Sequence, residues 1–205
     1  MTKLSFVARI LFVCGFLSTC CTPAIAQSDY PNKPVKIIVP FPPGGTTDIM
    51  ARISAEQLTK IFKQAFVIEN ISGGGGVIGA ERGANAAPDG YTLVMTGVGQ
   101  NAVAHGLDPN VKYDSLKDFV HISLIDLGPN VLVVNPDRPF KTLKDIVDYA
   151  RANPGKLDYG YTYASSGHMA MELLRQATST CVDVKKKLNC NPLPLVGIPY
   201  RGGGP

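Results

Sequence analysis

Apolar and polar positions in the first half of the chain follow two alternating periods. Residues 35–39, VKIIV, form a short β-branched run that stops at Pro40, as in a buried strand. After the segment 41–45, apolar residues recur at roughly helical spacing up to Phe62, with Thr46 or Thr47 as the expected N-cap. The order then repeats as a strand at 65–69, a loop at 72–76, a helix from Val77 to about Ala86 and a strand at 92–96. This alternation predicts a parallel sheet covered by helices on both faces.

The second half begins with two apolar runs, at 119–125 and 131–134, which predict strands. The separator DLGPN at 126–130 fits either a hairpin or a crossing between domains. Thr142-x-x-Asp145 then has the form of a capping box, and Pro154-Gly155 ends the helix that it begins. A strand at 157–161, a helix from Met169 to about Thr178 and a strand at 196–200 follow. We therefore expect one α/β domain over 27–126 and a second over 127–205.

The first 26 residues have the organisation of an export signal. Lys3 and Arg9 precede an apolar run at 10–17, and Ala24-Ile25-Ala26 forms a small-x-small cleavage site. The run would rise only about 12 Å as a helix, against a bilayer core of about 30 Å. Lipidation at Cys20 is the alternative, and Thr19 before it fits that poorly. We expect cleavage after Ala26 and a periplasmic protein.

Composition narrows the function classes. The chain is 45% hydrophobic and 18% charged, which excludes a disordered protein. The net charge is +4, and Lys and Arg are scattered apart from 185–187, so we expect no nucleic-acid partner. Outside the leader only Cys181 and Cys190 remain, and in an exported chain they predict a loop-closing disulfide, with two free thiols as the alternative. The three histidines lack metal-ligand spacing, so no metal is expected.

Three segments, 42–47, 164–167 and 201–205, place small or capping residues between a strand and an expected helix start. Free backbone N–H groups and the positive helix end make such a place suited to anions. The alternative is that Gly and Pro only make connections. Asp48, in a first turn, either complements the helix dipole, orients the loop or receives an ammonium group. His168 fits a ligand contact or a structural role equally well.

Enzymatic signatures are weak. Gly74-x-Gly76-x-x-Gly79 has the spacing of a dinucleotide fingerprint, but no acid for a ribose lies about 20 residues on. A P-loop motif does not occur in the sequence. The segment 163–167, YASSG, resembles a nucleophile elbow without its first Gly, and no His follows His168. We expect no catalytic residues and no cofactor.

Taken together, seven motifs resemble, in order, the Bug family of extracytoplasmic solute receptors, the substrate-binding components of tripartite tricarboxylate transporters. They are YPxKPVKIIVPFPPGGTTD at 30–48, APDGYTL at 87–93, LKDF at 116–119, LVVNP at 132–136, ANPGKL at 152–157, SSGH at 165–168 and PYRGGGP at 199–205. The resemblance implies a type II periplasmic binding-protein fold, in which two Rossmann-like α/β domains close around a small carboxylate. It also implies delivery of that ligand to membrane permease subunits, by a monomer without catalytic activity.

The resemblance further implies which residues bind the ligand. They would come from the first loop, from the loop at 97–101 and from an opposing wall: Phe41, Pro43, Gly44, Gly45, Thr46, Thr47, Asp48, Gly99, Gln100, Asn101, Ser165, Ser166, His168, Tyr200, Gly202 and Gly203. The loop GVGQN at 97–101 departs from a Ser/Thr-rich family pattern, and 179–197 is longer than usual. Family members continue well past position 205, so the resemblance implies an incomplete second domain and weak or absent ligand binding. The alternatives are an exported nucleotide-using or hydrolytic enzyme and a nonfunctional truncated receptor.

Overall fold

The computed structural model describes residues 30–183 and 188–202 of the 205-residue chain. Residues from Lys33 onward form one compact unit, which holds both parallel sheets. The expected export signal lies outside the described residues. Across the described ranges, no helix is both long and apolar enough to cross a bilayer.

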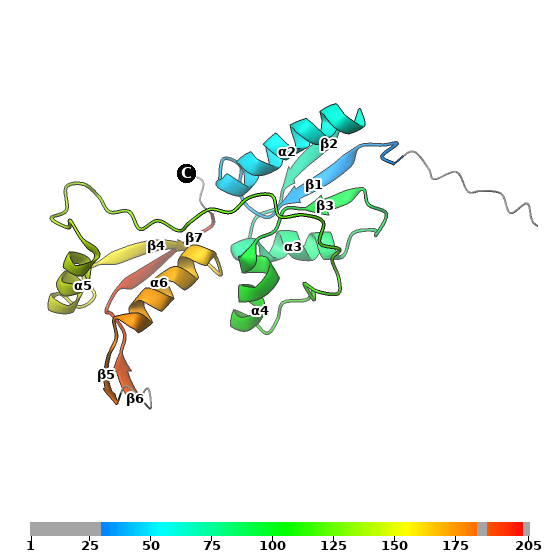
Figure 1. Ribbon diagram of the computed structural model, residues 1–205. Helices are drawn as coiled ribbons and strands as arrows, with labels where there is room; N and C mark the ends of the chain where they lie inside the picture. The colour runs from blue at the N-terminus through cyan, green and yellow to red at the C-terminus, as the bar shows by residue number, and fades with distance from the viewer. Residues whose placement is uncertain (1–29, 184–187, 203–205) are drawn as a thin grey trace, which may run out of the picture. The chain divides into compact units, whose positions relative to one another are not determined.

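The first part of this unit is a three-stranded parallel sheet in the order β2-β1-β3 (Figure 1). Its strands are β1 (Val35–Val39), β2 (Phe66–Asn70) and β3 (Thr92–Val94), and its helices are α2 (Thr46–Phe62) and α3 (Val77–Ala84). Because β2 and β3 flank β1 on opposite sides, right-handed crossovers place α2 and α3 on opposite faces of the sheet. The expected parallel sheet with two covered faces is confirmed.

The central position of β1 explains its sequence. Val35, Ile37, Ile38 and Val39 are each at most 3% exposed, because strands pair on both edges and helices cover both faces. On the α2 side, Ile37 and Val39 pack with Ala51 and Ala55 of that helix. The small alanine side chains let the helix approach the sheet closely. This packing fixes the end of β1, from which the first loop emerges.

The loop expected at 97–101 is partly wrong. Only Gly97 is loop: Val98 is already helical, and a π-helical turn, η2 (Gly99–Val103), then leads into α4 (Ala104–Leu107). Because of its glycines, the segment GVGQN shows no helical periodicity, so this helical turn was not predicted from the sequence.

The strands expected at 119–125 and 131–134 are also wrong. The chain there has no regular secondary structure, and every residue from 120 to 139 is exposed. Strands need a neighbour to complete their backbone hydrogen bonds, and the described residues pair none with this segment. The long connection between α4 and α5 is visible in Figure 1.

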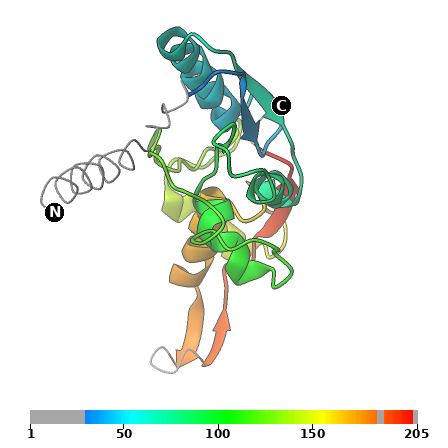
Figure 2. The same ribbon diagram turned by 90° about the vertical axis from the view of Figure 1, so that its right-hand side faces the viewer.

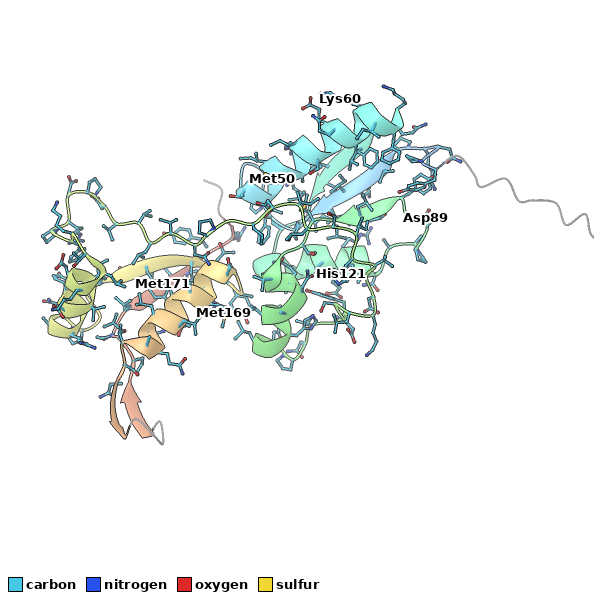
Figure 3. All side chains as sticks on the ribbon, in the orientation of Figure 1. Met50, Lys60, Asp89, His121, Met169 and Met171 are labelled. Carbon is cyan, nitrogen blue, oxygen red and sulfur yellow. The ribbon has the colours of Figure 1, made fainter. Side chains whose placement is uncertain are left out.

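The second part holds a two-stranded parallel sheet of β4 (Asp158–Thr162) and β7 (Val196–Tyr200), with α5 (Leu143–Ala152) and α6 (Ser166–Ala177). Val147 and Ala150 of α5 form its core with Leu193 and Leu195, and Met171 of α6, labelled in Figure 3, packs against it. The capping box is confirmed: the Thr142 side chain accepts from the Asp145 N–H, and the Asp145 carboxylate accepts from the Thr142 N–H. The two sheets lie on either side of the expected domain boundary at 126/127, which remains a prediction.

A hairpin that the sequence did not predict joins α6 to β7. It consists of β5 (Thr180–Asp183) and β6 (Leu188–Asn191), which project from the second sheet in both views (Figures 1 and 2). The antiparallel register sets Cys181 directly opposite Cys190. Their side chains are outside the described part of the structure, so the disulfide stays a prediction.

Candidate functional site

The site is built at the carboxyl edge of the first sheet. Its three strands are parallel, so the loops after Val39, Asn70 and Val94 emerge at one edge. The chain leaves β1 toward β2 through one face and reaches β3 through the other. Such a reversal next to the central strand opens a crevice where ligands of open α/β sheets bind.

Asp48, on the first turn of α2, holds the first loop in place. Its side chain is 3% exposed, and its Oδ2 accepts from the Gly44 N–H at 3.0 Å. Arg52 grips both carboxylate oxygens, with Nε at 2.9 Å from Oδ2 and Nη2 at 3.0 Å from Oδ1. Asn70, at the end of β2, donates to Asp48 Oδ1 and to the Phe41 carbonyl. One carboxylate thus ties the loop to its helix and to the neighbouring strand.

These hydrogen bonds determine the ionisation state of Asp48. The hydrogen bonds from Arg52 hold the pKa of Asp48 well below its usual range, with the Gly44 N–H and Asn70 adding to the effect against the opposing influence of burial. The same pair raises the pKa of Arg52. Asp48 is therefore a paired anion at neutral pH, and its charge is cancelled beside the helix start. An anionic ligand would not meet an unbalanced carboxylate there.

The start of α2 differs from those of α5 and α6. Its N-cap is Gly45, which has no side chain to accept the first-turn N–H groups. In contrast, Thr142 caps α5 and Ser165 caps α6 through its Oγ, 3.1 Å from the His168 N. The first N–H groups of a helix have no partner within the helix and carry its positive partial charge. The α2 start consequently presents N–H donors that no cap residue has taken.

Gln100 locks the other two loops of this edge. It is 2% exposed, its amide donates to the Gly75 carbonyl at 2.5 Å, and its Oε1 accepts from the Gly97 N–H. Tyr113 donates its hydroxyl to the Gln100 carbonyl at 2.7 Å. The side-chain groups of Gln100 are therefore engaged with the protein. Gln100 shapes the crevice as a positioning residue.

Part of the expected site lines a cavity of about 1140 Å³. Eight of the sixteen expected ligand-binding residues line it: Phe41, Gly45, Thr46, Thr47, Ser165, Ser166, Tyr200 and Gly202. Its polar groups include the hydroxyls of two threonines and two serines, on the first turns of α2 and α6 or directly before them. Ser166 also donates to Asn130 Oδ1 at 3.1 Å.

The other expected residues lie elsewhere. Asp48 and Gln100 hold loops as described, Pro43 and Gly44 are exposed on the first loop, and the Asn101 carbonyl accepts from Ser115. His168 stacks on Tyr161, with ring centroids 4.3 Å apart, and is not among the cavity-lining residues. Gly203 falls outside the described residues.

Gly99 has a packing role. A Cβ built on it would lie 2.8 Å from the Ala164 carbonyl oxygen, closer than side chains tolerate. The missing side chain lets the third loop of the first sheet contact the segment after β4. Gly99 thus leaves space for the main chain at Ala164. From the sequence alone, this role could not be told apart from leaving space for a ligand.

Two residues that matter for this geometry were missed. Arg52 follows Asp48 by one helical turn, so the i,i+4 spacing of opposite charges was a signal available in the sequence. Asn70 gave no such signal, because its partners Asp48 and Phe41 become neighbours only when β2 pairs with β1. Among the described residues, no group of three or more His, Cys, Asp or Glu side chains could hold a metal ion.

Comparison with known proteins identifies the family. Residues 50–205 match the model of the tripartite tricarboxylate transporter family receptor, TctC. The chain belongs to this receptor family. Protein BugT of Bordetella pertussis (strain Tohama I) is 36% identical over 203 residues, which cover 97% of this chain and 58% of BugT. The resemblance drawn from the seven motifs is thereby confirmed.

Solved structures of similar sequence support the fold. The structure described as R. palustris Rpa4515 with adipate is 33% identical, with a TM-score of 0.75, and MatC (Rpa3494) from Rhodopseudomonas palustris with bound malate is 30% identical, with a TM-score of 0.72. The match to Rpa4515 covers 84% of this chain and 54% of that one, and the match to MatC covers 84% and 55%. The chain spans about half the length of the curated relatives it matches. The expected periplasmic binding-protein fold is confirmed.

Proposed function

We propose that the receptor binds a small carboxylate at the start of α2 and serves a tripartite tricarboxylate transporter from the periplasm. The observation that carries this proposal is the α2 start itself, which is uncapped, lines the cavity and lies beside a neutralised Asp48. Oriented N–H groups with neighbouring hydroxyls are what a carboxylate needs.

Family membership supports the ligand class. Two solved relatives are described with adipate and with malate, which share carboxylate groups and differ in the carbon chain between them. Backbone N–H groups hydrogen-bond the carboxylate that the two acids share and do not distinguish between their carbon chains. Binding requires no nucleophile or base, so we infer a receptor without catalysis that passes its ligand to permease subunits.

The test removes the Thr46 N–H, and with it the Thr46 hydroxyl, without disturbing the helix. Thr46 is the first residue of α2, and Gly45 before it has φ −79° and ψ 167°, which a following proline accepts. Proline is favoured at this position and lacks the N–H. Thr46→Pro should therefore weaken malate and adipate binding by about tenfold or more, since a charge-assisted hydrogen bond contributes about 1.5–3 kcal/mol.

Leu143→Pro is the matched control, because Leu143 is the first residue of α5 and follows Thr142 at φ −135° and ψ 161°. Leu143 also lines the cavity, but it is apolar and the start of α5 is already capped by Thr142, so this variant should leave carboxylate binding unchanged. Binding is measured by amide chemical shifts during titration with each acid, which also detects millimolar affinity. Shifts centred on 45–47 that weaken in Thr46→Pro support the proposal, and titrations that leave these amides unmoved in the parent chain contradict it.

A further inference from the structure

The turn between β4 and α6 has a strained backbone. A hydrogen bond from the Ser165 N–H to the Thr162 carbonyl, 3.1 Å between N and O, closes this turn. Its third residue, Ala164, has φ +58°, in the left-handed region that glycine or asparagine normally occupies at this position of a turn. Such strain persists only where the surrounding structure fixes the residue, and it clusters at ligand sites. Ala164 is 0% exposed, so neighbouring protein atoms surround it.

Two glycines of the first sheet lie against this turn, Gly75 after β2 and Gly99 after β3. A Cβ built on Gly75 would lie 2.3 Å from the Tyr163 carbonyl oxygen, and one built on Gly99 would lie 2.8 Å from the Ala164 carbonyl oxygen. Real Cβ atoms essentially never come within 3.0 Å of another heavy atom. A larger residue at either position would have to displace main chain. We call the approach of the two glycines to these two carbonyls the glycine contact.

Gln100 makes the two glycines act together. Its amide donates to the Gly75 carbonyl at 2.5 Å, and Gly99 directly precedes it in the chain. Tyr113 holds the Gln100 carbonyl at 2.7 Å. The two loops therefore form one surface of fixed shape, and consecutive carbonyls of the turn rest on it. A contact at two points restricts the rotation of the turn as well as its distance from the first sheet.

The turn carries part of the candidate carboxylate site. Ser165, the N-cap of α6, and Ser166 directly follow Ala164, and they line the cavity that Thr46 and Thr47 also line. Moving the turn would move the serine hydroxyls relative to the start of α2. Hydrogen bonds weaken steeply as their distance and angle depart from the optimum, so a site that draws on both helices needs the turn in one position.

We propose that Gly75 and Gly99 are positioning residues of the carboxylate site. The glycine contact holds the β4–α6 turn against the loops of the first sheet and maintains the strained backbone of Ala164. It thereby keeps the serine hydroxyls of α6 at the cavity that the start of α2 lines. This inference rests on the proposed function for its ligand, whereas the contact itself is testable without any ligand.

Two variants each add a side chain to the glycine contact, and each has a matched control. Gly99→Ala is compared with Gly106→Ala, because both glycines have helical backbone and a Cβ on Gly106 would meet nothing within 4 Å. Gly75→Asn is compared with Gly155→Asn, because their φ values are +66° and +70°, a region that asparagine tolerates, and Gly155 also has open space around it. Within each pair the backbone strain is similar, and only one member contacts the turn.

Residual dipolar couplings report the relative orientation of the two parallel sheets without a ligand. They are measured for the amides of β1, β2 and β3 and for those of β4 and β7. The orientation that fits the parent should also fit Gly106→Ala and Gly155→Asn, and it should fail for Gly99→Ala and Gly75→Asn. The fit within each sheet should stay as in the parent in all four variants, which shows that each variant is folded.

Titration with malate and adipate connects the contact to the site. Gly99→Ala and Gly75→Asn should each weaken binding by about tenfold or more, and the two controls should bind as the parent does. The proposal is overturned if both contact variants keep the sheet orientation of the parent. It is also overturned if they bind both acids as the parent does despite an altered orientation.

A parent chain that binds neither acid contradicts the proposed function and leaves the contact to be decided by the couplings. An altered sheet orientation in the two contact variants alone then still supports the glycine contact as the feature that holds the turn. An unaltered orientation overturns it.

Discussion

The two parallel sheets hold the loops of the candidate site by different means. In the first sheet, buried side chains from separate elements lock the loops: Asp48 joins the first loop to Arg52 and Asn70, and Gln100 joins the second loop to the third. In the second sheet, the loop before α6 is held by a local cap, in which Ser165 accepts from His168 three residues away. Helix α6 has no buried residue, whereas α2 has three.

This difference indicates which loops keep their conformation without contacts from a ligand or from further chain. A buried, multiply bonded carboxylate fixes a loop before any ligand arrives, because moving the loop would leave charged groups unpaired. A helix cap fixes only its own turn. We expect the first sheet to provide a rigid wall of the site and the second to provide a wall whose order depends on what covers it.

The largest effect should come from removing the Asp48 carboxylate. Asp48→Ala leaves the Gly44 N–H and the Asn70 amide without their acceptor and should destabilise the protein by about 3 kcal/mol. Asp148→Ala is the control, since Asp148 pairs with Lys144 at i,i+4 on the exposed surface of α5. Urea unfolding should show no measurable change for this control. Equal losses in the two variants would remove the distinction between the walls.

Lowering the pH should weaken the stabilisation that comes from the Asp48 network. The pKa of Asp48 is lowered in the folded protein from an ordinary value of 3.8, chiefly by Arg52. A lowered folded pKa stabilises the protein above the unfolded value, and the contribution is lost as pH falls below about 4 toward the folded value. The stability difference between the parent and Asp48→Asn should therefore be full at pH 7 and shrink on acidification. A difference that stays constant down to pH 2 would show that the charge of Asp48 is irrelevant.

A smaller effect tests the second wall. Ser165→Ala and Thr142→Ala each remove a helix cap and should each destabilise the protein by about 1 kcal/mol. Both residues line the cavity, but only Ser165 belongs to the group of hydroxyls at the starts of α2 and α6, so only its loss should also weaken malate or adipate binding. Thermal unfolding and the amide titration measure the two quantities separately. Weaker binding in Thr142→Ala would mean that the site extends to α5.

Local sequence signals predicted most helices and strands but not the contacts between them. The run 35–39 and the Thr142–Asp145 capping box were identified correctly because their signals lie within one element. The strands at 119–125 and 131–134 were wrong because the pattern reports strand character, while a strand also needs a partner. Likewise, the N-cap of α2 is Gly45 rather than Thr46 or Thr47, because Asp48 accepts a hydrogen bond from the Gly44 N–H and so holds the preceding loop against the helix.

The site was predictable to the level of its loops. Motifs marked 41–48 and 165–168, and the cavity draws on both segments. The roles of individual side chains were not, because Asp48 and Gln100 act through partners that are distant in sequence. Asn70 is 22 positions from Asp48, and Gly75 is 25 positions from Gln100. Only the pairing of strands brings these atoms together.

The cancellation of the Asp48 charge by Arg52 has a consequence for how the proposed carboxylate ligand would reach the site. The loop and first turns from 41 to 52 carry no net formal charge, so a passing metabolite feels no long-range pull toward them. Attraction comes from peptide dipoles, whose influence fades within one turn of helix. Capture at this spot would change little with ionic strength, and acids bearing one, two or three charges would be admitted on similar terms.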